Sequence, residues 1–115
     1  MLALGLTIAL SSVSATAVAQ ALPQSVEAAF STYRQCLFGA IDEQYRDRAA
    51  AFSEREVISA CASVRRAEFV NAVARLNDAG WSAEASRGQV HRKFAELDES
   101  VWTIVGHLRA RRASR

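Results

Sequence analysis

Residues 26–45 read VEAAFSTYRQCLFGAIDEQY. Their large apolar side chains recur at steps of three or four positions, which is the spacing of one face of an α-helix. Pro23 stands just before this stretch, at a position that the first turn of a helix tolerates well. The sequence therefore predicts a helix over residues 23–46, with its apolar stripe formed by Val26, Phe30, Tyr33, Leu37, Ile41 and Tyr45.

A second helix is predicted over residues 54–79. Ser53 and Glu56 have the spacing of a capping box, and Phe52 and Val57 that of a hydrophobic staple. Gly80 suits the left-handed residue that follows a helix, and Trp81 then stands where a Schellman motif makes an apolar contact. The apolar face contains Val57, Ile58, Cys61, Val64, Phe69, Val70, Val73 and Leu76.

A third helix is predicted over residues 86–111. Ser86 and Gln89 form another capping-box pattern, and Ser82 offers an alternative start one turn earlier. The apolar positions follow a heptad pattern, which is typical of a helix packed lengthwise on others. These positions are Val90, Phe94, Leu97, Val101, Ile104 and Leu108, flanked by Trp102 and Val105.

The predicted fold class is all-α, because no useful length of the chain alternates with period two. Helices of similar length joined by short loops favour an up-down-up three-helix bundle. The domain is expected over residues 22–108, with a leading segment at 1–21 and a basic tail at 109–115.

Cys36 and Cys61 are the two cysteines of the chain. In an exported protein an even cysteine count favours a disulfide. The separation of 25 positions does not fit a Cys-x-x-Cys redox pair, and His91 and His107 do not stand at the spacing of zinc ligands. A bridge closing a tight helical hairpin would centre the turn near Arg48.

Residues 1–21 read MLALGLTIALSSVSATAVAQA. The apolar run has the length of a signal-peptide core and is shorter than a membrane span. Small residues allow cleavage after Ala19 or Ala21, although no Lys or Arg precedes the run. We therefore expect export to the periplasm or the extracellular space, with a retained membrane anchor as the alternative.

The 115 residues carry 14 Lys and Arg against 12 Asp and Glu, all from Glu27 onward. This composition is typical of one small domain, and argues against a multi-pass membrane protein or a two-domain enzyme. Thirteen of the basic residues are Arg, a bias that we interpret as the mark of a GC-rich bacterial genome.

No grouping typical of catalysis is found, so an enzyme is not expected, nor a metal or cofactor. His91 and His107 are interpreted as partly exposed helix residues. The acidic residues Glu96, Asp98 and Glu99 point in different directions on a helix and are interpreted as a solvated face.

The C-terminal tail contains Arg109, Arg111, Arg112 and Arg115. Cations at a helix C-terminus interact favourably with the helix dipole, which is the simplest explanation of these residues. The functional interpretation is contact with an anionic envelope surface. Nucleic acid is not an expected partner, because the chain is predicted to be exported and the tail has no interleaved aromatic residues.

Two further features indicate partner contacts. Trp81 and Trp102 are candidates for a partner face, since tryptophan is enriched in protein interfaces. The heptad seam over residues 90–108 is expected to line the protein's own core, with self-association as the alternative.

The stretch Tyr33-Arg-Gln-Cys36-Leu37, followed by a helix with Ala60-Cys61-Ala62, resembles uncharacterised small secreted bacterial helical proteins. The resemblance covers about 30 residues and implies a disulfide-joined helical hairpin and an exported location. It implies no function.

The leading hypothesis is an exported, non-enzymatic helical protein of the bacterial envelope that binds a protein partner or an anionic surface. One alternative is a carrier of a small hydrophobic ligand inside the bundle. A second is a cytoplasmic nucleic-acid-binding protein, if residues 1–21 are not a signal. The carrier would use Phe30, Tyr33, Phe69, Phe94 and Trp102 as its lining.

Overall fold

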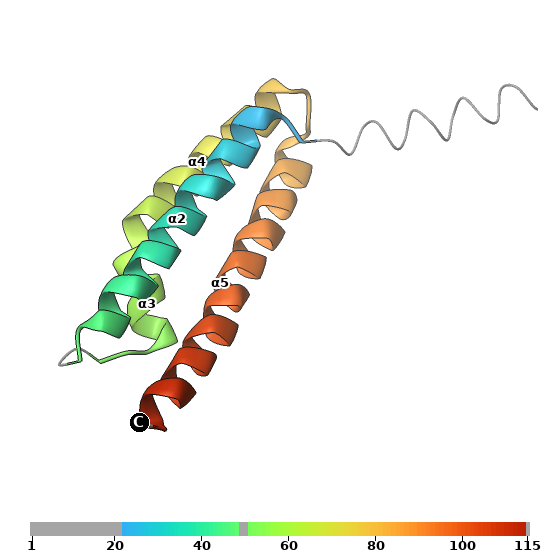
Figure 1. The fold of residues 1–115 in the computed structure, drawn as a ribbon. Coiled ribbons are helices and arrows are strands. Elements are labelled where there is room, and N and C mark those ends of the chain that lie inside the picture. The colour runs from blue at the N-terminus through green and yellow to red at the C-terminus, as the bar shows by residue number, and fades with distance from the viewer. Residues whose placement is uncertain (1–21, 49–50, 115) are drawn as a thin grey trace, which may run out of the picture.

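The computed structural model describes residues 22–48 and 51–114. Both ranges are built from α-helices and contain no strand, which confirms the all-α prediction (Figure 1). The predicted signal segment lies outside the described residues. The helices are α2 (Gln24–Arg46), α3 (Glu54–Ala60), α4 (Ala62–Asp78) and α5 (Ala83–Ala113).

Helix α2 follows the first predicted helix closely. It begins after Pro23, whose carbonyl accepts hydrogen bonds from the N–H groups of Val26 and Glu27. It ends at Arg46, where Asp47 adopts an extended conformation. Its predicted stripe is buried up to Ile41 and half-buried at Tyr45.

The second predicted helix is divided into α3 and α4 at Cys61. Ser53 caps α3 as predicted, its hydroxyl accepting a hydrogen bond from the Glu56 N–H at 3.2 Å. At Cys61 the backbone leaves the helical region, with φ −107° and ψ 14°. The N–H of Cys61 donates to the carbonyl of Ile58, three residues back, so the helix tightens locally where the chain forms its disulfide.

The connection between α4 and α5 is a Schellman turn. Gly80 has φ +99°, and the Trp81 N–H donates to the Leu76 carbonyl at 3.0 Å, as the sequence predicts. Helix α5 begins one turn earlier than the start predicted at Ser86, because Ser82 accepts a hydrogen bond from the Ala85 N–H at 3.1 Å. Ser86 lies inside the helix, is fully buried and donates to Asn77 at 2.8 Å.

Helix α5 has 31 residues and continues to Ala113. The division of the chain into a domain ending at residue 108 and a separate basic tail therefore does not correspond to a structural boundary. Figure 1 shows α2 and α5 running in one direction and α4 returning in the other.

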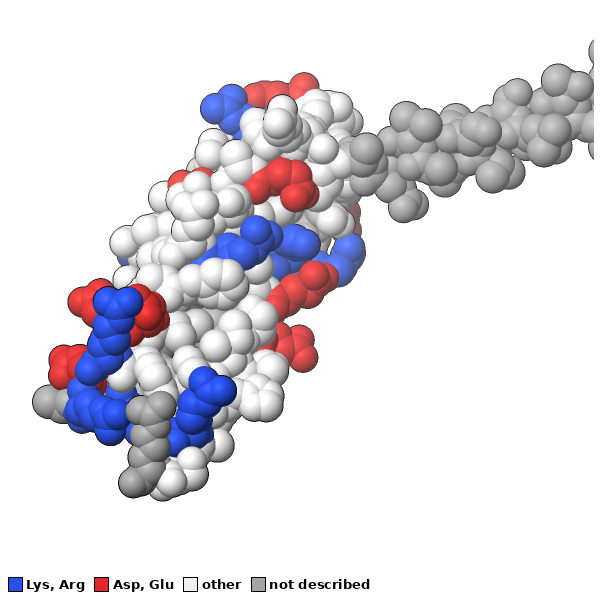
Figure 2. Space-filling view, in the orientation of Figure 1, with Lys and Arg blue, Asp and Glu red and all other residues white. Residues whose placement is uncertain are grey.

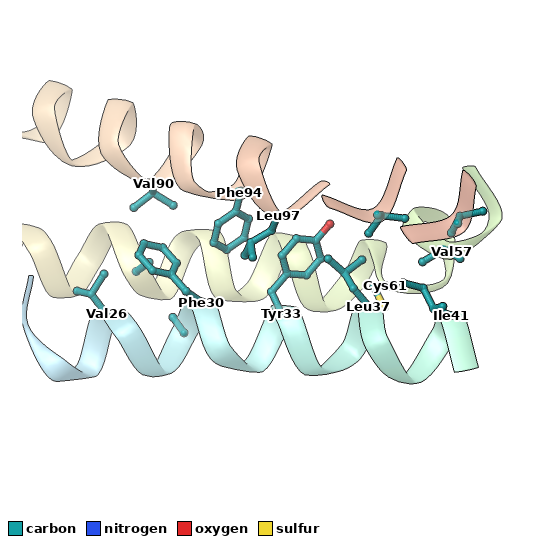
Figure 3. Packing of buried hydrophobic residues seen from close by; sticks show 14 of the residues in the cluster. Val26, Phe30, Tyr33, Leu37, Ile41, Val57, Cys61, Val90, Phe94 and Leu97 are labelled. Atoms are coloured by element: carbon teal, nitrogen blue, oxygen red, sulfur yellow. The ribbon is translucent and has the colours of Figure 1, made fainter. Parts of the chain in front are cut away.

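The core is one apolar cluster to which every described helix contributes (Figure 3). The heptad seam of α5 faces this cluster, with Val90, Phe94 and Val101 fully buried. The other helices thus cover most of this seam, whereas Ile104 and Leu108 are only half-buried. Among the described helices, none has the length and apolar character needed to cross a membrane.

Candidate functional site

The predicted disulfide between Cys36 and Cys61 is present and joins α2 to the junction of α3 and α4. The two Cα atoms are 6.0 Å apart, within the range that a disulfide requires. Cys61 is fully buried and Cys36 is half-buried. The bridge thus closes the helical hairpin that the sequence predicts.

A polar cluster formed by Tyr33, Arg65 and Asp98 lies at the centre of the molecule, one residue from each of α2, α4 and α5. The hydroxyl of Tyr33 donates a short hydrogen bond to one carboxylate oxygen of Asp98. The other carboxylate oxygen accepts two hydrogen bonds from Arg65, at 3.2 Å from Nε and 2.8 Å from Nη2. This Tyr33–Arg65–Asp98 cluster joins three helices through one carboxylate.

Aromatic rings surround this cluster. The ring of Tyr33 stacks on that of Phe94, with ring centres 4.9 Å apart, and Figure 3 shows both side chains between α2 and α5. The guanidinium of Arg65 lies 5.8 Å from the centre of the Tyr33 ring and 5.4 Å from that of Phe94. These are distances at which a cation is attracted to an aromatic ring.

The electrostatics favour a neutral tyrosine beside the ion pair of Arg65 and Asp98. Burial raises the pKa of Tyr33 well above its usual range, and the hydrogen bond and negative charge of Asp98 raise it further. For Arg65, partial burial opposes the charged form, but the hydrogen bonds and charge of Asp98 outweigh it and raise the pKa. Burial and Asp98 thus favour the protonated, neutral form of Tyr33, and Asp98 favours the charged form of Arg65.

The sequence interpretation of Asp98 as part of a solvated face is wrong. Its side chain is about one fifth exposed and bonds to both Tyr33 and Arg65. Asp98 follows Leu97 of the apolar seam, and a buried tyrosine hydroxyl usually finds a polar partner. The predicted burial of Tyr33 indicates that its hydroxyl needs a polar partner, and the position beside Leu97 places Asp98 near the core. Neither signal identifies Asp98 as that partner among the polar residues of the chain.

Two arginines of the predicted tail are engaged within the protein. Arg109 forms an ion pair with Glu54, the first residue of α3. Arg112 donates to the carbonyl oxygens of Gln44, at 3.2 Å, and of Tyr45. Both carbonyls belong to the last turn of α2, where a cation is favoured by the helix dipole.

Arg112 also packs over two rings, 5.2 Å from the centre of Tyr45 and 5.1 Å from that of Phe52. Of the arginines expected to face an anionic surface, Arg109 and Arg112 instead hold the end of α5 against α3 and α2. Arg111 is exposed to solvent, and Arg115 lies outside the described residues.

The two tryptophans differ. Trp81 is half-buried and packs against the core at the turn that follows α4. Trp102 of α5 is 57% exposed. Val70 of α4 is 69% exposed, so its predicted place on the apolar face of the second helix is wrong. Phe38 of α2, which lies beside the predicted stripe, is 46% exposed.

The remaining polar candidates lie on the surface. His91, His107, Glu96 and Glu99 are exposed, and Glu96 is 4.0 Å from Lys93. Within residues 22–48 and 51–114, no three His, Cys, Asp or Glu side chains come together in a way that could hold a metal ion.

The aromatic residues considered as a ligand lining pack against one another. Phe94 contacts the rings of Phe30 and Phe69 edge to face, at 5.8 and 5.6 Å between ring centres, as well as that of Tyr33. Trp102 points away from this group, to solvent. Phe30, Tyr33 and Phe69 thus each pack against Phe94.

Comparison with protein-family models, with curated proteins and with solved structures found no match to this chain.

Proposed function

We propose that this chain is an exported, non-enzymatic helical protein of the bacterial envelope that binds a protein partner through the face of α5 around Trp102. The observation that carries the proposal is the exposure of Trp102. It is 57% exposed, whereas the seam on the same helix is enclosed in the core. Tryptophan side chains are among the residues that contribute most to protein interfaces.

The scaffold in this proposal is an up-down-up three-helix bundle in which α3 and α4 together act as one bent helix. It would be released from a signal segment at residues 1–21. The apolar run of that segment and the Cys36–Cys61 disulfide both support an oxidising compartment outside the cytoplasm.

Binding is favoured over catalysis because the polar side chains of the central cluster are hydrogen-bonded to one another. The central cluster brings together a phenol, a guanidinium and a carboxylate, which are the groups an active site would use. Each of them is bonded to another member of the same cluster. Their arrangement supports a role in holding α2, α4 and α5 together.

A protein partner is favoured over an anionic surface because Arg109 and Arg112 are bonded within the protein. Arg109 is 51% exposed, but its charge is paired with Glu54. Among the described arginines of the tail, Arg111 is the exposed one that forms no ion pair. One such cation provides little attraction to anionic headgroups, since each contributes about 1 kcal/mol near a membrane surface.

The proposal is tested by placing a photo-reactive amino acid at Gly106, one helical turn after Trp102. A side chain there meets open space, so the probe is tolerated. In cells of the organism that encodes the chain, we expect a discrete protein adduct. Because truncation of an interface tryptophan commonly costs 2 kcal/mol or more, Trp102→Ala should reduce its yield at least about tenfold.

The matched control is Val70→Ala, which removes a similarly exposed apolar side chain from α4. It should leave the adduct unchanged. An adduct that survives Trp102→Ala, or one formed with phospholipid in place of protein, would contradict the proposal.

A further inference from the structure

A second exposed aromatic residue, Phe38, lines a hollow between α2 and α5. The hollow has a volume of about 300 Å³, and its apolar lining comes from both helices. Figure 2 shows an area of uncharged surface between the C-terminal halves of α2 and α5, with charged side chains at its borders. Besides Phe38, the apolar lining consists of Ile41, Tyr45, Ile104 and Leu108.

This Phe38 face is distinct from the face around Trp102. Trp102 precedes Ile104 by two residues, which corresponds to a rotation of about 200° around an α-helix. Ile104 borders the hollow, so Trp102 projects from the other side of α5. A ligand on one face therefore leaves the other free.

The charges beside Phe38 form a self-complementary pattern. Arg34 and Asp42 stand four residues before and four residues after Phe38, so the three side chains share one ridge of α2. If two α2 helices cross antiparallel at Phe38, Arg34 of each copy lies opposite Asp42 of the other. A two-fold contact would thus create two equivalent ion pairs around a central pair of aromatic rings.

Neither charge is committed to a strong contact in the single chain. Asp42 pairs with Arg46 at 2.9 Å, but both side chains are well exposed, and such pairs contribute only about 0.3–0.5 kcal/mol. Arg34 is half-buried and makes no ion pair with another residue of the described ranges.

We propose that the Phe38 face docks against the same face of a second copy of this chain, with the two α2 helices antiparallel across a two-fold axis at Phe38. We assign a second copy as the occupant because this face carries both a positive and a negative side chain. In a two-fold dimer, Arg34 of each copy would meet Asp42 of the other. The apolar lining is small, so the dimer is expected to be weak and concentration-dependent. This docking does not depend on the partner proposed for Trp102.

The proposal is tested by sedimentation equilibrium of the purified, oxidised protein between about 1 µM and 1 mM, a range that covers weak association. The wild-type protein should shift from monomer to dimer within this range. Phe38→Ala should weaken the dimer at least about tenfold, because it removes the central aromatic contact from both copies at once.

A charge exchange provides the decisive comparison. Arg34→Asp alone and Asp42→Arg alone should each weaken the dimer, because each places like charges opposite one another. The double variant Arg34→Asp with Asp42→Arg should restore it. Circular dichroism of each variant checks that α2 remains folded.

Trp102→Ala serves as the control and should dimerise as the wild type does. A wild-type protein that stays monomeric up to 1 mM, a dimer unaffected by Phe38→Ala, a dimer lost in Trp102→Ala, or a double variant that fails to recover would each overturn the proposal.

Discussion

The pair formed by α2 and α4 and the single helix α5 are held in the molecule by different means. Helix α2 is bonded covalently to the start of α4 through Cys36 and Cys61. Helix α5 contains no cysteine, so packing and polar side chains hold it in place. Its polar contacts reach α2 and α4 from Asp98, α3 from Arg109 and the end of α2 from Arg112.

This difference shows what apolar and polar residues each contribute. Burial of the α5 seam drives the helix onto the others and sets which side faces inward, but the hydrophobic effect is non-directional and fixes rotation and axial position only coarsely. Charge-assisted hydrogen bonds require specific geometry. We infer that Asp98, Arg109 and Arg112 set the position of α5, as the disulfide does for α2 and α4.

The largest effect is expected from removing the covalent link. In the chain-entropy description, a bridge between residues separated by 25 positions contributes about 3.5 kcal/mol. The double variant Cys36→Ser with Cys61→Ser should lose about that much free energy of unfolding, measured by urea titration under oxidising conditions. An unchanged transition midpoint would show that the bridge contributes nothing to the α2–α4 pair.

Asp98→Ala tests the corresponding contact of α5. It leaves both Arg65 and the Tyr33 hydroxyl without their partner in a largely enclosed position, so we expect a loss of about 3 kcal/mol. Hydrogen exchange should increase more in α5 than in α2 and α4, which the disulfide still joins. The exposed neighbour Glu99→Ala should change stability by less than about 0.5 kcal/mol. Equal effects of the two variants would contradict the assignment.

Tyr33→Phe removes one hydrogen bond to a charged group and should cost about 1.5 kcal/mol at neutral pH. The folded protein keeps the Tyr33 proton at pH values where the unfolded chain releases it, since the pKa is raised from 10.0. The stability due to this proton is complete below about pH 10 and falls as the pH rises above it.

The wild type should therefore lose its advantage over Tyr33→Phe between about pH 10 and 11.5, as measured by urea titration at each pH. A difference that stays constant over this range would show that Tyr33 titrates normally.

Arg112→Ala should have the smallest effect, about 1 kcal/mol, because it removes hydrogen bonds to the last turn of α2 and the contact with two aromatic rings. Arg111→Ala, at the exposed neighbouring position, should be neutral in thermal unfolding. The reverse order would mean that the end of α5 is not fixed by Arg112.

The parts of the fold that depend on local sequence were predictable. The stripe of α2, the Ser53 cap, the Schellman turn at Gly80 and the disulfide all follow from spacing within one segment or from cysteine count. The break at Cys61 was not predicted, because the apolar pattern continues across it. Ser82 and Ser86 both fit a cap, and the pattern alone does not choose between them.

The polar contacts between helices could not be predicted in the same way. The central cluster forms only when three helices take specific rotations and axial positions, which bring together Tyr33, Arg65 and Asp98. An apolar stripe determines the rotation and the axial position of a helix no more closely than about one residue. The same reason applies to Arg112, which a sequence pattern shows only as one cation near a helix end. The exposure of Phe38 could be read from α2 alone, because it lies beside the predicted stripe and not within it.

The proposed export and the Cys36–Cys61 disulfide can both be tested by the intact mass of the chain expressed from Met1 in a Gram-negative host. The mass is measured with thiol alkylation before and after reduction. We expect a soluble species cleaved after Ala19 or Ala21 that is alkylated at Cys36 and Cys61 only after reduction. A full-length species with two free thiols would contradict both.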